Sequence, residues 1–576
     1  MQVVPQSGHS GSVQSRAVRP SNPVIWLTTL VLGACALVIS TYHYFHHTWD
    51  EPEHLAAGMQ LIDRGVYSYD QQHPPLARVA MAIGPYLAGA HSYGEPGPSG
   101  EQEGRDLLYR TGNYDQLLTL ARLGVLPFYA VLLLSTWCWA RYAYGDRVGL
   151  LAVALLVATP VVLGHAGVAA LDVPGAAMCT LSFYCLLRWL EQHQWRYAIA
   201  SGIGAGLAVG TKLSGLPFVV LVAMSWALTD MAAHALGWKR HHASLTVGAR
   251  WFAQGACIAL LALLAAIFCY GFQFHYAVTD QAPYNTALSY LFGRGGWAHD
   301  AAHAIARHVP LPVGLERLIW SIEALVRHNS AGHQSYLLGH FSQNGFRYFY
   351  PVALAVKTPL PLLLAGIAGI LFLCARLRTR GWVYAAPALA FMTLLAFCCF
   401  YSHINIGVRH VFVLYPTLAI AAAALLGHLW QRYSHRWVRG AMLGLLALQA
   451  GTMVLTYPDY LAYFNLTAGA HPERILIDSD LDWSQDIKRL QQRLVQLQVM
   501  KFGFVYRGSA DVVGEHLPGV WMVQPFSPAT GWIAASIFAR DTVSQGKAFE
   551  WLKQYTPRER IGKSIDLYYI PDKAGT

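Results

Sequence analysis

Residues 23–54, PVIWLTTLVLGACALVISTYHYFHHTWDEPEH, decide the fold because they join a lipid-soluble segment directly to a polar cluster. The run 23–42 contains no charged residue and has the length of about 20 residues that a membrane-spanning helix needs. No small-residue cleavage site follows it, so it predicts a retained first span. Asp50 and Glu51 follow at once. The stretch therefore predicts carboxylates at the boundary between membrane and water.

Ten more apolar stretches follow. Of the 576 residues, 55% are hydrophobic and 12% are charged, about half the charged fraction of a soluble protein. The expected spans are 23–42, 117–140, 148–164, 174–190, 197–211, 214–232, 251–271, 352–375, 382–400, 410–429 and 438–457. Lys212 to Gly215 predict a broken or re-entrant region between two short spans. We expect a polytopic α-helical membrane protein with about eleven (10–13) transmembrane helices.

The basic residues of the short loops predict the orientation. With the N-terminus in the cytoplasm, every short loop on that side carries arginine or lysine, as the positive-inside rule requires. The basic residues form no single surface, so we expect no nucleic-acid partner. The predicted domains are a disordered cytoplasmic tail (1–22), a membrane catalytic domain (23–457) with outer loops 43–116 and 272–351, and an extracytoplasmic domain (458–576). Short apolar runs in that last segment predict a small α/β fold.

The acidic residues after the first span have two interpretations. Leu55, Met59 and Ile62 recur at helical spacing, which predicts an amphipathic helix on the membrane surface. Asp50 could cap this helix, with Glu53 completing a capping box. Alternatively, a carboxylate beside a half-buried cavity gains basicity and can act as a general base.

Motifs along nearly the whole chain resemble one superfamily. They are Asp50-Glu51, His73-Pro74-Pro75-Leu76, Leu171-Asp172-Val173-Pro174, Gly210 to Gly215, Tyr336 to Gly339, Gly345 to Pro351, Lys357-Thr358-Pro359, Gly407 to His410 with Tyr415-Pro416, and Asp478 to Asp486. The chain resembles the protein O-mannosyltransferase and aminoarabinose-transferase superfamily of GT-C fold enzymes, as a bacterial phospholipid-carrier-dependent member. The resemblance implies a polyprenyl-phosphate-sugar donor, an active site at the extracytoplasmic face of the bacterial inner membrane, and Asp50 as the catalytic or acceptor-side carboxylate.

One departure concerns the sugar. Gln72-His73-Pro74 stands where aminoarabinose transferases carry Glu-Lys-Pro, so their sugar specificity is not carried over. The acceptor stays open between a lipid, a glycan and a protein hydroxyl.

The predicted chemistry needs cations beside the donor. Negative charge grows on the phosphate as the glycosidic bond breaks, and fixed cations in a water-poor site stabilise it. The candidates at the outer ends of spans are Arg409, Arg347, Lys357, His73, Lys212 and Arg78. Lys357 could instead snorkel at the interface, and Lys212 could cap a broken helix.

Asp172, two residues before Pro174, is either a plain helix cap or a second catalytic carboxylate that faces Asp50 across a cavity. In the second case it would orient the acceptor or the sugar, or hold a divalent ion.

Metal binding is the weaker hypothesis. Glu51 and His54 have a usable ligand spacing, but no His-Glu-x-x-His pattern is present. We therefore expect no required cofactor, with a divalent cation as the alternative. In the tail, Asp482 with Gln485 fits a capping box at the start of a helix over 483–499. The motif there is interpreted as structural.

These observations predict an inverting glycosyltransferase with Asp50 as base. The alternative is a transporter or flippase of lipid-linked sugars. Transporters often show repeats and charges near the middle of spans, whereas the charges here gather at one face.

Overall fold

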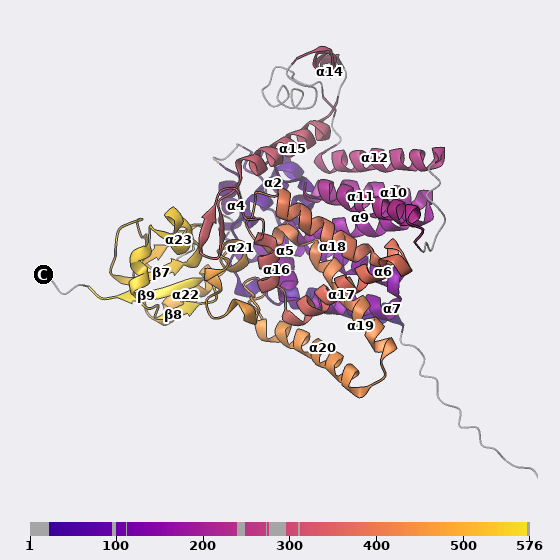
Figure 1. Cartoon of the computed structure of the whole chain (residues 1–576). Helices are drawn as coiled ribbons and strands as arrows, with labels where there is room; N and C mark the ends of the chain where they lie inside the picture. Colours follow the sequence, from indigo (N-terminus) through magenta and orange to yellow (C-terminus); the bar gives the residue numbers. More distant parts are fainter. Residues whose placement is uncertain are drawn as a thin grey trace, which may run out of the picture.

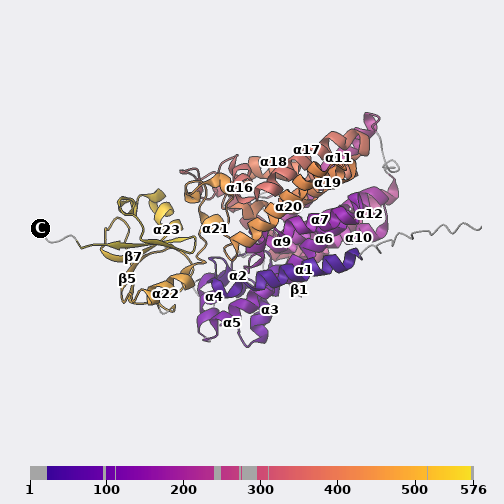
Figure 2. The same ribbon diagram turned by 90° about the horizontal axis from the view of Figure 1, so that it is seen from below.

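The computed structural model describes residues 22–94, 99–110, 112–238, 248–271, 274–275, 295–308, 311–515 and 517–572. The predicted disordered tail, except for its last residue, lies outside the described residues. A helical bundle forms one end of the molecule and a small sheet domain forms the other (Figures 1 and 2). Helices α2, α4, α5, α16 and α21 lie between the two parts (Figure 1).

Every predicted span is helical. The helices are α1 (Pro23–Ile39), α5 (Tyr114–Leu123), α6 (Leu126–Tyr144), α7 (Asp146–Val157), α8 (Pro160–Ala166), α9 (Asp172–Gln192), α10 (Trp195–Thr211), α11 (Gly215–Ala235), α12 (Ala249–Tyr270), α16 (Phe349–Lys357), α17 (Leu360–Arg380), α18 (Trp382–Tyr401), α19 (Leu414–Arg432) and α20 (Arg436–Thr456). Among the described residues, 8 helices are long and apolar enough to cross a membrane, or 9 if the pair α7 and α8, bent by 71°, forms one span. The chain is a multi-pass membrane protein.

Two breaks in the bundle have local causes. Lys212 is extended, with φ −152° and ψ 125°, so α10 ends before it and α11 begins at Gly215, as predicted. Pro160 begins α8 directly after the bend, where its missing N–H costs no helical hydrogen bond.

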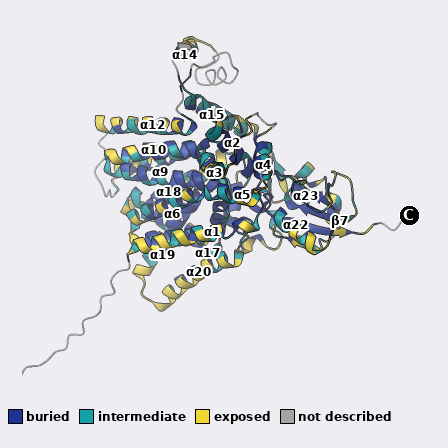
Figure 3. Cartoon of the chain, turned by 180° about the vertical axis from the view of Figure 1, so that it is seen from behind, coloured by how far each residue is buried: buried dark blue, intermediate teal, exposed yellow. Residues whose placement is uncertain are grey.

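Small residues allow close helix packing within the bundle. A Cβ on Gly206 of α10 would lie 2.4 Å from the carbonyl oxygen of Ala262 in α12, so only glycine fits there. At the edges of the bundle, α12 and α20 carry many exposed residues (Figure 3). Trp437 and Leu455 of α20 are 89% and 88% exposed. Apolar side chains this exposed are suited to a lipid environment.

The first outer loop forms α2 (Glu51–Arg64), α3 (Pro75–Leu87) and α4 (Gly100–Tyr109). The prediction that the first of these lies on the membrane surface is wrong. Its apolar face packs against α3 and α4, and both Leu55 and Met59 are buried in protein. Gly58 makes the close approach possible, because a Cβ there would lie 2.1 Å from the carbonyl oxygen of Arg78.

The second outer segment supplies a hairpin near the tail. Its described elements are β1 (Phe274–His275), α14 (Trp297–His308), β2 (Leu311–Pro312), α15 (Val313–Ala331), β3 (Ser335–Leu337) and β4 (His340–Ser342). Strands β3 and β4 pair antiparallel, with Tyr336 opposite Phe341. The backbone N–H of Leu338, in the turn, donates to Ile475 of the tail at 3.0 Å.

The tail contains a five-stranded sheet of order β6-β5-β7-β9-β8. Its elements are α22 (Ile487–Gln496), β5 (Phe502–Val505), β6 (Val520–Met522), β7 (Gly531–Ser536), α23 (Ile537–Thr542), η5 (Val543–Gly546), η6 (Glu550–Gln554), β8 (Glu559–Ile561) and β9 (Ile565–Ile570). Strand β5 is parallel to β6 and β7, and β9 is antiparallel to β7 and β8. Helix α22 covers one face of the sheet and α23 the other (Figure 2).

The core that packs α22 on the sheet begins at Ile487, and Ile477 and Leu481 pack against Ile537 of the same domain. Other residues before Ile487, such as Tyr460 and Leu476, pack on the core of the membrane part. This preceding segment contains η3 (Leu466–Ala468), η4 (Pro472–Arg474) and α21 (Asp478–Leu481). The predicted helix over 483–499 is therefore shorter at its start, since residues 483–486 form a connection.

Candidate active site

Asp50 lies immediately before α2, at the junction of three outer segments. Its Oδ2 accepts a hydrogen bond from Nη1 of Arg409 at 2.5 Å. The guanidinium of Arg409 lies over the ring of Trp483, 4.3 Å from its centroid. Asp50 makes no side-chain cap to α2, so the capping-box interpretation is wrong. The first loop, the loop before α19 and the tail thus converge on one carboxylate.

The loop before α19 fixes Arg409. Val408 to Val411 form a short 3-10 turn, η2. The backbone N–H of Val408 donates to both carboxylate oxygens of Asp480, at 3.1 and 3.3 Å. A Cβ on Gly407 would lie 2.6 Å from Oγ of Ser479, so a larger residue would displace that hydroxyl. The tail motif therefore positions the arginine.

Arg409 is surrounded by acidic groups. Burial lowers its pKa, but the carboxylates of Asp50, Asp172 and Asp478 outweigh this effect, and the pKa of Arg409 lies above its ordinary value. Each of the three therefore lies within electrostatic reach of a single cation. That Asp172 faces Asp50 across a cavity stays a prediction.

Asp172 forms a second ion pair at the start of α9. Its Oδ1 accepts from Nζ of Lys212 at 2.7 Å, and its Oδ2 lies 3.8 Å from Nδ1 of His165. Its helix has no side-chain cap from Asp172, so the capping interpretation of this residue is also wrong. Within the described residues, Oδ2 of Asp172 and both ring nitrogens of His165 are buried without a hydrogen-bond partner. Buried polar atoms of this kind mark a place for a ligand or a water molecule.

Glu51 has a structural role, which corrects the prediction that it is catalytic. It is 2% exposed, and its carboxylate accepts from Arg122 at 2.8 and 2.9 Å. It also accepts from the backbone N–H groups of Thr48 at 2.6 Å and Ala169 at 2.7 Å. Burial raises the pKa of Glu51, but Arg122 and these hydrogen bonds bring it below its ordinary value. Such a carboxylate is not available to a substrate.

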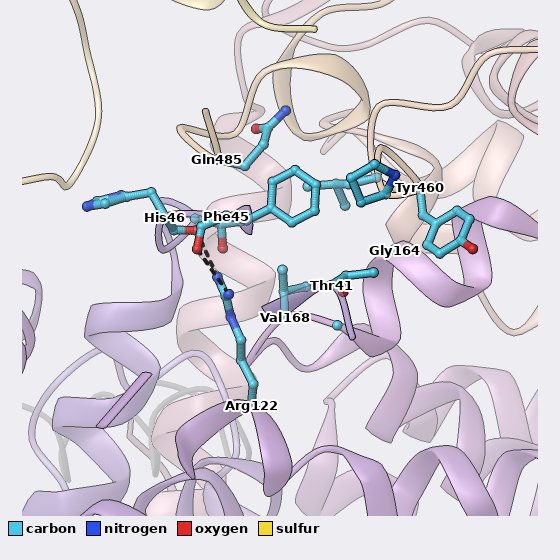
Figure 4. Close-up of a pocket in the computed structure, with 12 residues that line it drawn as sticks. Thr41, Phe45, His46, Arg122, Gly164, Val168, Tyr460 and Gln485 are labelled. Atoms are coloured by element: carbon cyan, nitrogen blue, oxygen red, sulfur yellow. Dashed lines mark hydrogen bonds between the residues drawn. The ribbon is translucent and has the colours of Figure 1, made fainter. Parts of the chain in front are cut away.

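Arg122 ties the same loop together. Its guanidinium points to the backbone at Phe45 and His46 (Figure 4), with Nη2 donating to the carbonyl oxygen of His46 at 2.8 Å. The small cavity beside it measures about 20 Å³, and Thr41, Gly164 and Tyr460 are among its lining residues. That volume is enough for about one water molecule. The cavity is therefore too small for a substrate.

The prediction that Arg78 binds the donor phosphate is also corrected. It is completely buried and donates to the Tyr67 hydroxyl at 3.0 Å, to Nδ1 of His54 at 3.1 Å and to the Asp70 carboxylate. Nδ1 of His73 pairs with the same carboxylate at 2.6 Å. Arg78 therefore organises the first loop and does not reach a donor phosphate. Arg78 donates to His54, and Arg122 donates to Glu51. Neither side chain is then available as a ligand, so the suggested metal pair of Glu51 and His54 is wrong as well.

Lys357 supports the site from behind instead of binding donor. It is fully buried, and its Nζ donates to the carbonyl oxygens of Leu461 at 3.0 Å and Asp480 at 2.5 Å. Neither snorkelling nor phosphate binding fits this position. Arg347 is exposed, with its guanidinium 6.0 Å from the ring of Phe400, and no described contact joins it to Asp50. Of the predicted cations, Arg409 and Lys212 are the two paired with catalytic candidates.

The tail motif is interpreted from the sequence as structural, but its contacts with the first loop are not among the predictions. The backbone N–H groups of His46 and Trp49 donate to the carbonyl oxygens of Gln485 and Trp483, at 3.0 and 3.1 Å. Asp482 caps no helix at 483; its Oδ2 accepts from the Ser536 hydroxyl and the Phe538 N–H at 2.6 and 2.9 Å. The sequence showed the motif, but its partners in the first loop are more than 400 residues away along the chain.

Known proteins share this architecture. The family model for dolichyl-phosphate-mannose-protein mannosyltransferase matches residues 27–278. No curated protein sequence matches the chain. The S. cerevisiae protein O-mannosyltransferase Pmt1-Pmt2 complex bound to the sugar donor aligns with a TM-score of 0.51 and 12% identity, covering 76% of this chain and 90% of that chain. ArnT from Cupriavidus metallidurans bound to undecaprenyl phosphate gives a TM-score of 0.49 at 12% identity, covering 96% and 99%.

These similarities define the fold. The chain has the GT-C type fold of the S. cerevisiae Pmt1-Pmt2 complex. Its residues 27–278, less than half of the chain, match the family model for dolichyl-phosphate-mannose-protein mannosyltransferase. The predicted helical membrane fold is confirmed, including the small sheet domain at the C-terminus, whereas the count of about eleven spans stays a prediction. The transporter alternative is not favoured.

Proposed function

We propose that the chain transfers one sugar from a polyprenyl-phosphate-linked donor to an acceptor hydroxyl, with Asp50 as the general base and inversion at the anomeric carbon. One observation carries the proposal: the Asp50 carboxylate is held by Arg409 over Trp483, where three outer segments meet. A fixed carboxylate beside a fixed cation supplies both a proton acceptor and a counter-charge for a leaving phosphate.

The proposed reaction is a single displacement. Asp50 takes the proton of the acceptor hydroxyl while the acceptor oxygen forms a bond to the anomeric carbon. The bond between that carbon and the phosphate oxygen breaks, and its electron pair stays on the phosphate. Attack opposite the leaving group inverts the anomeric configuration. The products are the glycosylated acceptor and a polyprenyl phosphate with one additional negative charge.

Arg409 and Lys212 are proposed to bind the leaving phosphate. Their side chains are 12% and 17% exposed, so both are accessible yet partly desolvated. Each is paired with a carboxylate, Asp50 and Asp172 respectively, which balances its charge before the donor binds. A planar guanidinium can contact a carboxylate and a phosphate oxygen at the same time.

We further propose that the site and the tail face the extracytoplasmic side of a bacterial inner membrane, with the N-terminus in the cytoplasm. The basic short loops support this orientation. The partners are then the lipid-linked donor, membrane lipids and a lipid, glycan or protein acceptor. No cofactor is required for the displacement itself; a divalent cation stays the alternative.

The proposal is tested by mass spectrometry of envelope lipids, glycans and proteins from cells that lack the gene. The cells are complemented with the wild-type chain, with Asp50→Asn or with Asp115→Asn. Asp115 is the matched control because it lies in the same loop region, is 72% exposed and pairs with Lys488 at the surface. One molecule should regain a fixed sugar mass with the wild type and Asp115→Asn but not with Asp50→Asn. Full recovery with Asp50→Asn contradicts the proposal.

A further inference from the structure

A second and larger cavity lies between the β3–β4 hairpin, the loop before α19 and the tail. It measures about 140 Å³ and is lined by Tyr336, Phe341, Asn405, Asp478, Arg507 and Phe538, among others. If each water-sized site takes roughly 10–15 Å³, the space suits about ten non-hydrogen atoms, near the size of one sugar ring.

The cavity adjoins the proposed reaction centre. Trp49, the neighbour of Asp50 in the chain, packs edge-on against Phe538 with ring centroids 5.7 Å apart. The guanidinium of Arg507 lies over the same Trp49 ring, 5.9 Å from its centroid. Asp478 and Asp480 also line the cavity, and both lie within electrostatic reach of Arg409. A molecule in this space would be close to Asp50.

The walls combine flat rings with polar side chains. Tyr336 and Phe341 face each other edge to ring at 5.2 Å across the hairpin. Asn405 is 2% exposed and lines the cavity. Its Oδ1 accepts from the N–H of Phe346 at 2.6 Å, and its side chain also contacts the Tyr350 hydroxyl. These contacts fix a polar amide in the cavity wall.

Asp478 is built into this wall in an unusual conformation. Its φ of 40° lies in the left-handed region, which costs a non-glycine residue free energy. Its Oδ1 accepts from the N–H of Ser479 at 2.6 Å, which fixes the carboxyl. Burial raises the pKa of Asp478 to about 7, with Arg409 opposing and Asp50 adding to the shift. Near neutral pH such a carboxyl both donates and accepts hydrogen bonds.

We propose that this cavity binds the acceptor, that the acceptor is a saccharide, and that Asp478 positions its reactive hydroxyl toward Asp50. This inference rests on the proposed function. Sugar rings present apolar faces, which pack on aromatic side chains, and hydroxyls, which need carboxyl and amide partners. Asp478, Asn405 and the rings of Tyr336 and Phe538 supply both kinds of contact. A lipid acyl chain would offer no hydrogen-bond partner to these polar walls, at a cost in affinity.

Binding is tested first with the full-length protein in nanodiscs. The probes are an array of immobilised mono- and disaccharides, serine- and threonine-containing peptides, and vesicles of phosphatidylethanolamine and phosphatidylglycerol. The wild type should capture a subset of the saccharides. Asp478→Asn and Phe538→Leu should weaken that capture at least tenfold, while Asp511→Asn, a tail carboxylate that bonds within its own loop, should not. Capture of only peptides or vesicles, or equal saccharide capture by Asp478→Asn, overturns the inference.

Kinetics with a captured saccharide separate positioning from folding. Asp478→Asn should raise KM for the saccharide at least tenfold and leave KM for the polyprenyl-phosphate donor within twofold. A loss of kcat with both KM values unchanged contradicts the positioning role. Sugar transfer to a peptide or lipid but to no saccharide would sink this inference and leave the proposed function intact. Saccharide capture without any sugar transfer would instead contradict the proposed function and leave saccharide binding in this cavity intact.

Discussion

The adjacent carboxylates Asp50 and Glu51 provide a matched test of the two roles that the structure assigns. Glu51→Gln removes the charge that compensates the fully buried Arg122. Breaking a buried ion pair by removing one partner typically costs about 3–5 kcal/mol. Asp50→Asn instead leaves a half-exposed amide beside Arg409 and should have little effect on stability. One variant should therefore lose stability and the other should lose activity.

The expected shift in melting temperature follows from chain length. At about 2 cal/mol/K per residue, unfolding all 576 residues gains roughly 1 kcal/mol/K, so Glu51→Gln should lower the apparent melting temperature by about 3–5 °C. Helices that persist in the membrane gain less entropy and make the shift larger. The intrinsic fluorescence of the 18 tryptophans in nanodiscs is a suitable readout.

The same preparations are assayed for sugar transfer below the melting range. Folded Glu51→Gln should retain at least a tenth of the wild-type rate, whereas Asp50→Asn should fall by about 10²–10⁴, the usual contribution of a general base. A Glu51→Gln protein with the wild-type melting temperature and no activity would contradict the structural role of Glu51, because it would make Glu51 catalytic.

Further predictions concern the surroundings of Asp50. Trp483→Leu removes the ring under Arg409 and should lower kcat/KM about tenfold; because the ring is also buried against Val168 and Leu461, the melting temperature should fall as well, and Trp483→Phe, which keeps an aromatic ring, is the control. Arg409→Lys keeps the charge but loses the planar fork and should lower kcat/KM by about 10²–10³, and a loss under threefold would contradict a role in phosphate binding. The folded-state pKa of Asp478, about 7, exceeds its ordinary 3.8, so the folded chain binds more protons between about pH 4 and 7 and its stability falls as pH rises through that window. Asp478→Asn should reduce the difference in melting temperature between pH 5 and pH 8, and an unchanged difference would contradict the burial of this carboxyl.

Patterns that are local in the sequence predicted the fold. Span lengths depend on lipid thickness, and the break at Lys212 depends on nearby residues, so both could be inferred from short windows. The position of Asp50 and Arg409 at the ends of spans could also be predicted, because Asp50 follows an apolar run and Arg409 precedes one, and each run fixes the depth of its neighbour. The motif from Asp478 to Asp486 was visible, although its partners were not.

The roles of other charged residues depended on contacts between segments that lie far apart in the sequence, which no short stretch of sequence contains. Glu51 is separated from Asp50 by one peptide bond, and only the distant Arg122 makes it structural. Arg78 has the same chemistry as Arg409, but Asp70 and Tyr67 enclose it. His165 gave no signal, since a single histidine in an apolar run resembles a core residue. Tertiary packing thus decided which charges are available to a substrate.

Asp50 is proposed to take the acceptor proton while Arg409 holds the Asp50 carboxylate in place. The most direct measurement is a single-turnover assay in nanodiscs, with acceptor present, that follows release of polyprenyl phosphate from a labelled donor. Asp50→Asn should slow release at least about 100-fold while donor binding stays within threefold of the wild type and of Asp115→Asn. Release at the wild-type rate by Asp50→Asn would contradict this role.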